Sequence, residues 1–161
     1  MKLLLGRLST VFVLLIAVAS ASVGGDESSS PWAFNGPRGE GYTIDLIDVQ
    51  PAPGTPLIAG ASVEFTVRVK YTLAIASHGS IVLVFQDEKN QSATRSQVMK
   101  KVDKGAGELI LSDRVFIPVD ARELRLFVPL VPEGLTHTKG EVTIRYPVRK
   151  PTSADDRRSP S

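Results

Sequence analysis

The sequence predicts an all-β fold: a single antiparallel β-sandwich of two sheets and about seven strands. Residues 62–73 provide the clearest evidence, because every odd position is apolar and every even position is polar. A period of two places the apolar side chains on one face of a strand, whereas a helix would spread them around its circumference. Further short apolar stretches are separated by turn residues, and no helical period follows residue 21. Strands with this spacing are typical of a sandwich.

The first 21 residues have the pattern of a secretory signal peptide. Lys2 and Arg7 precede an unbroken apolar run over residues 11–19, and Ala19 and Ala21 supply the small residues of a cleavage site. The run is well short of the ~20 residues that span a bilayer. We therefore expect an exported protein, periplasmic or extracellular, with no membrane span after cleavage. The absence of cysteine excludes a disulfide framework.

The charge balance argues against nucleic-acid binding. Lys2 and Arg7 are two of the 19 Lys and Arg residues, so the chain after residue 21 carries 17 of them, equal to its 17 Asp and Glu residues. Binding to phosphates needs a basic excess or stripe. None remains after cleavage, so nucleic acid is excluded as an expected partner.

Beyond residue 21 the composition divides the chain into three parts. Residues 22–41 are rich in Gly, Ser and Pro and predict a flexible N-terminal arm, residues 42–149 contain the sandwich, and residues 150–161 predict a disordered tail. Trp32 and Phe34 are unusual in such an arm. They either fold back over the sandwich or form an exposed aromatic contact for a partner.

The expected strands differ in their environments, which the side-chain pattern indicates. The seven strands are expected at 42–50, 62–73, 81–85, 96–102, 109–117, 124–130 and 140–148. In the first, the apolar set changes face after Leu46, which predicts either a β-bulge or a strand that changes sheet. Residues 81–85 are apolar on both faces and predict a central strand covered on both sides. Lys100 and Lys101 indicate an edge strand, and we expect residues 77–80 and 103–107 to be turns.

The strand pattern of residues 42–148, including PAPGTPLIAGASVEFTVRVKYTL and GELILSDRVFIP, resembles the immunoglobulin-like and fibronectin-type-III-like domains of secreted bacterial proteins. Many such domains are adhesion-related modules. The resemblance implies an immunoglobulin-like sandwich and provides no catalytic residues to transfer. The chain departs from antibody domains because it lacks the two cysteines and the associated Trp.

One candidate site follows from the topology. If strands alternate in direction, three connections meet at one end of the sandwich: 77–79, 103–107 and 132–139. His78 and His137 then lie together, with Asp103 or Glu133 close by. Imidazole and carboxylate groups suit zinc or copper, so these four residues are weak candidates for a metal site. A loop-borne surface for a protein or glycan is the alternative that we favour.

Phe127 provides a second candidate surface. It stands on the polar side of its strand, between Arg125 and Pro129. Either the arm with Trp32 and Phe34 covers it, or it belongs to an exposed patch that meets a partner. The candidate binding residues are therefore Trp32, Phe34, Phe127, His78 and His137.

No hydrolase, phosphate-loop or zinc-protease motif occurs in the sequence, so we expect no enzyme activity and no cofactor. The leading hypothesis is a secreted, non-catalytic module for binding or adhesion, with a protein or glycan partner. One alternative is a metal-handling or hydrolytic protein that uses the His78 and His137 end. Another is a structural component of an envelope assembly.

Overall fold

A computed structural model describes residues 31–94, 97–136, 138 and 140–152. This part of the chain consists of strands and connecting segments, without a helix. The strands are β1 (Ala33–Asn35), β2 (Tyr42–Gln50), β3 (Leu57–Ile58), β4 (Ser62–Asp87), β5 (Val98–Phe116), β6 (Glu123–Pro132) and β7 (Glu141–Arg149). The expected signal peptide and most of the expected tail lie outside the described residues.

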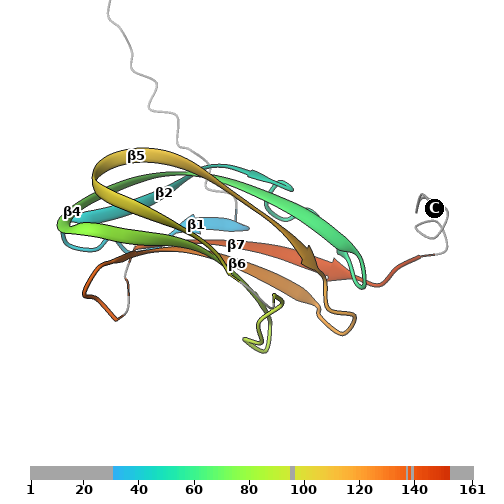
Figure 1. Ribbon diagram of the computed structural model, residues 1–161. Coiled ribbons are helices and arrows are strands. Elements are labelled where there is room, and N and C mark those ends of the chain that lie inside the picture. The colour runs from blue at the N-terminus through green and yellow to red at the C-terminus, as the bar shows by residue number, and fades with distance from the viewer. Residues whose placement is uncertain (1–30, 95–96, 137, 139, 153–161) are drawn as a thin grey trace, which may run out of the picture.

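The two longest strands, β4 and β5, form an antiparallel ribbon that bends back on itself (Figure 1). Their pairing changes register between Leu73 and His78, so four residues of β4 lie opposite only Lys104 of β5. The left-handed backbone of Gly105, with φ of 129°, lies at this bend and favours glycine. The bend divides each strand between two layers that face each other.

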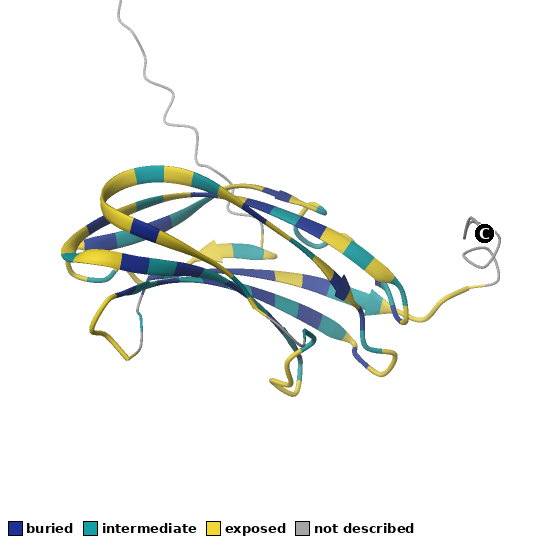
Figure 2. Ribbon diagram, in the orientation of Figure 1, coloured by how far each residue is buried: buried dark blue, intermediate teal, exposed yellow. Residues whose placement is uncertain are grey.

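Each layer contains one half of the bent ribbon. The β2 layer consists of β2, the first half of β4 (residues 62–73) and the second half of β5 (residues 105–116). The β6 layer consists of β1, β7, β6, the second half of β4 (residues 79–87) and the first half of β5 (residues 98–103). Burial alternates along both halves of β4 (Figure 2).

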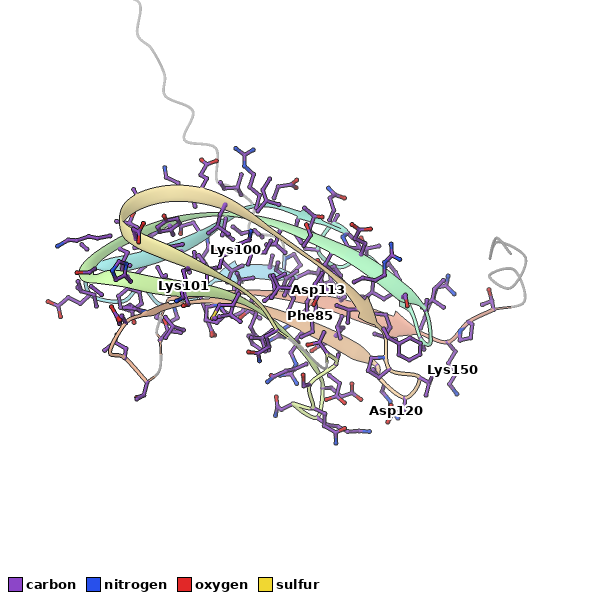
Figure 3. All side chains as sticks on the ribbon, in the orientation of Figure 1. Phe85, Lys100, Lys101, Asp113, Asp120 and Lys150 are labelled. Atoms are coloured by element: carbon purple, nitrogen blue, oxygen red, sulfur yellow. The ribbon has the colours of Figure 1, made fainter. Side chains whose placement is uncertain are left out.

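Phe65 packs between the layers. Its side chain in β4 is fully buried, and its ring centroid lies 4.9 Å from that of Phe85 and 5.3 Å from that of Tyr146. Phe85 belongs to the other half of β4 (labelled in Figure 3), and Tyr146 to β7. Burial raises the pKa of the Tyr146 hydroxyl, which stays protonated and donates a hydrogen bond of 2.9 Å to the carbonyl oxygen of Pro51.

The predicted all-β, antiparallel architecture is confirmed, but the two layers are not separate sheets. All seven strands belong to one hydrogen-bonded sheet, because β4 and β5 continue from one layer into the other. The short strand β3 pairs with β7 in parallel, and the amide of Gly60 then donates to Ile117 beside the end of β5. The sheet therefore approaches a closed barrel.

Two predictions about strand detail are confirmed and two are corrected. The register of β2 shifts between Leu46 and Asp48, as a bulge requires. Among the described strands, β5 pairs with β4 alone, as an edge strand does. The expected turns at 77–80 and 103–107 are instead bends within β4 and β5. Residues 81–85 are also not covered on both sides, because Val82 and Val84 are only half-buried.

The expected flexible arm contains a strand. Residues 33–35 pair with Val142, Thr143 and Ile144 of β7, and the amide of Arg145 donates to the carbonyl oxygen of Trp32 at 2.7 Å. The sheet therefore begins nine residues before the expected boundary at residue 42, because backbone pairing compensates for weak local strand propensity. No helix in the described residues is long and apolar enough to cross a membrane.

Candidate functional site

An open hollow of about 690 Å³ lies at the end of the molecule where β4 and β5 bend. It is lined by the β4–β5 bend, the outer face of the two strands and the segment that follows β6: His78, Gly79, Ser80, Val82, Met99, Lys101, Asp103, Val131, Pro132, Glu133, Gly134 and Leu135. Most of its surface is apolar, with a few polar groups at the rim. A ligand site typically combines these features at this volume.

The rim of the hollow is fixed by a pair of side chains at the bend. Nδ1 of His78 lies 2.9 Å from Oδ1 of Asp103, and the two residues face each other across the ribbon directly after the register change. The carbonyl oxygen of His78 also accepts a hydrogen bond of 2.9 Å from the amide of Glu133. These contacts connect the ribbon to the segment after β6 and place the backbone of Glu133 beside the His78–Asp103 pair.

The opposite wall is a tight turn after β6. The amide of Leu135 donates to the carbonyl oxygen of Pro132 at 3.2 Å, and Gly134 adopts a φ of 84°. This turn leaves the Leu135 side chain 42% exposed beside the hollow. Met99, on the other side, is 56% exposed. Two flexible apolar side chains therefore border an open space, which suits a site that accepts an apolar group.

The outer face of the β6 layer extends this apolar surface away from the hollow. Phe34, Thr143, Phe127 and Val84 are successive cross-strand partners, so their side chains lie in one row on the same face. Phe34 is 48% exposed, Phe127 is half-buried and Thr143 is buried. Along β4, Val82 follows on the same face and lies opposite Met99 at the hollow.

The outer face of the β2 layer is more polar along β4, where charged and hydroxyl side chains alternate with the buried ones. Arg68 pairs with Glu108 at 2.6 Å, and Arg114 with Glu64 at 3.4 Å. Such exposed pairs interact favourably with water and contribute little to stability. This face also carries two exposed apolar side chains of β5, Ile110 opposite Arg68 and Phe116 opposite Ser62. The hollow, continued by the apolar row, therefore distinguishes the β6 layer as the candidate binding face.

The candidate residues from the sequence fall into separate groups. Phe34 and Phe127 share the outer face of the β6 layer, and His78 lies at the hollow. Trp32 lies beside Gly54, so close that a Cβ on Gly54 would meet the indole at 2.4 Å. His137 lies outside the described residues. In the described part of the chain, no three His, Asp or Glu side chains converge as metal ligands would.

Several residues of the hollow escaped the sequence reasoning. Met99 and Lys101 occupied the polar face of a weak strand, and Val82 belonged to a run predicted to be covered on both sides. Leu135 lay in a loop without a period. The sequence did contain a signal for Val82. Residues 81–85 are apolar on both faces, and no other segment was available to cover the outer face.

No protein-family model matches the chain, and no curated protein matches its sequence. Among solved structures, the crystal structure of the apo form of the Calx CBD1 domain is similar over 70% of this chain and 100% of that domain, with 15% sequence identity and a TM-score of 0.39.

Proposed function

We propose that the chain is an exported, non-catalytic binding module of the immunoglobulin-like sandwich type, which docks a partner protein on the outer face of its β6 layer. The observation that carries the proposal is the hollow beside Met99 and Leu135, which continues into the row of Phe127 and Phe34. An apolar surface that is rimmed by polar groups is a common feature of protein interaction sites. The adhesion-type role expected from the sequence is one form of this function.

A protein partner fits this face better than a glycan does. The exposed groups along the row are Phe, Val, Met and Leu side chains, which gain free energy when another apolar surface removes water from them. Polar side chains flank the row at both ends. His78, Asp103 and Glu133 form the rim of the hollow, and Gln86, Arg125 and Arg145 lie opposite one another beyond Phe127. This arrangement of an apolar centre with a polar rim is the anatomy of a protein interface.

The test uses side-chain mimics and methyl NMR. N-acetyl-leucinamide and N-acetyl-phenylalaninamide should shift the methyl signals of Val82, Met99 and Leu135, whereas Val115, buried in the core, should not respond. Methyl glucoside serves as the glycan control. The variant Leu135→Asp should weaken the response, because a charge beside the hollow disfavours burial of an apolar group. Shifts caused by the sugar alone, or no shift at the hollow, would refute the proposal.

A further inference from the structure

We propose that the first half of β5, residues 98–103, is a strand-addition site that accepts an extended, acidic segment of a partner protein. The inference rests on the proposed function and specifies the partner's chemistry. In this mode the partner adds a strand to an open sheet edge, its backbone supplies the hydrogen bonds, and alternate side chains enter neighbouring pockets.

The edge is available for pairing. Across the described residues, β4 is the only strand that pairs with β5, so alternate backbone N–H and C=O groups of β5 point away from the sheet. Residues 98–103 pair with β4 without a register change. This half is also the part of β5 that borders the hollow, through Met99 and Lys101.

The charges on this edge select the partner. Lys100 and Lys101 lie within it, with one carboxylate, Asp103, and Lys104 follows directly (Figure 3 labels Lys100 and Lys101). Lysines on an edge oppose pairing between two copies of the chain, because like charges would meet. The same lysines favour an acidic strand, because directly opposite charges on neighbouring strands attract. The edge therefore disfavours self-association and favours an acidic partner.

The hollow determines the side-chain pattern of the partner. Met99 and Lys101 lie on the outer face, opposite Val82 and Ser80 of β4. A partner residue opposite Met99 would reach the hollow and should be apolar, and the residue two positions away, opposite Lys101, should be acidic. Lys100 points to the other face and favours an acidic residue between these two positions. An apolar residue followed or preceded by two acidic residues is the expected pattern.

The test uses the synthetic peptide acetyl-Thr-Val-Glu-Glu-Leu-Val-Thr-amide and its reversed sequence, which cover antiparallel and parallel addition. Binding is measured by amide NMR shifts and hydrogen exchange on the full chain without its first 21 residues. We expect protection of outward-facing β5 amides between residues 98 and 103, and binding that weakens with salt. A peptide with backbone N-methyl groups should lose both effects because it cannot pair.

Charge reversal provides the matched control. The double variant Lys100→Glu and Lys101→Glu should bind the acidic peptide about tenfold more weakly and should prefer a peptide with Lys in place of both Glu residues. Binding without β5 amide protection, or equal affinity of both proteins for both peptides, would overturn the inference. If the hollow still responds to N-acetyl-leucinamide but neither peptide pairs with β5, the strand-addition site is refuted while the proposed function stands. If neither responds, both are refuted.

Discussion

Replacing Phe65 by alanine should destabilise the domain more than any substitution at the surface, because this ring packs between the two layers. Phe65 is fully buried and contacts the rings of Phe85 and Tyr146. Phe→Ala changes in cores cost about 3–5 kcal/mol, and aromatic pairs add about 0.5–1.5 kcal/mol each. We expect a loss of about 4 kcal/mol in the free energy of unfolding, which lowers Tm by about 15 °C for a domain of this size.

The assay is urea unfolding followed by far-ultraviolet circular dichroism, with Lys70→Ala as the matched control. Lys70 lies on the same strand but on the outer face of the β2 layer, where its side chain is exposed. Its removal should change the free energy of unfolding by less than about 0.5 kcal/mol. Equal losses in the two variants, or a loss below about 1 kcal/mol for Phe65→Ala, would show that the layers do not pack through this ring.

Two further predictions concern hydrogen bonds between distant parts of the chain. Tyr146→Phe should destabilise the domain by about 1–2 kcal/mol in the same urea assay, since the Pro51 carbonyl oxygen loses its buried donor; an unchanged midpoint would contradict this. The carboxylate of Glu88 has its pKa lowered by hydrogen bonds from its own backbone amide and from that of Arg122. A lowered pKa in the folded state contributes stability that is present above the usual value of 4.5 and is lost as the pH falls below it. The thermal stability of Glu88→Gln should therefore depend less on pH between about 5 and 3 than that of the parent; identical pH profiles would refute the role of this carboxylate.

The sequence predicted the strand faces because side-chain alternation is a local property. The bulge after Leu46 and the edge strand expected at residues 96–102 each followed from a short stretch, and the structure confirms the bulge and, for residues 98–102, the edge position. The bends were not predictable in this way. Residues 77–80 and 103–107 have turn composition, but each stretch has a partner strand: residues 78–80 pair with 101–103, and residues 105–107 pair with 71–73. Pairing therefore continues on both sides of the bend. Whether such a residue ends a strand or bends it depends on its partner strand, which one segment does not reveal.

The candidate site was predictable only in part, for a similar reason. The alternation of strand direction brought the His78, Asp103 and Glu133 segments to one end, which the structure also does. The apolar wall was not expected, because Met99 and Leu135 stand in segments of mixed polarity. Their contribution depends on how the turn after β6 lies against the ribbon, which is a tertiary property.

The hollow and the apolar row on the outer face of the β6 layer are the strongest physical reason to expect a partner. Val82 and Val84 stand at outer positions of the second half of β4, where the first half has Thr66 and Arg68. A sheet face that meets only water usually alternates with polar side chains, so apolar side chains at successive outer positions need a further reason. The half-buried valines and Phe127 beside them still expose apolar surface, and they gain further free energy when another apolar surface covers it. An added strand at β5 would begin that cover at the hollow, and the row from Val84 toward Phe34 would extend it across the layer.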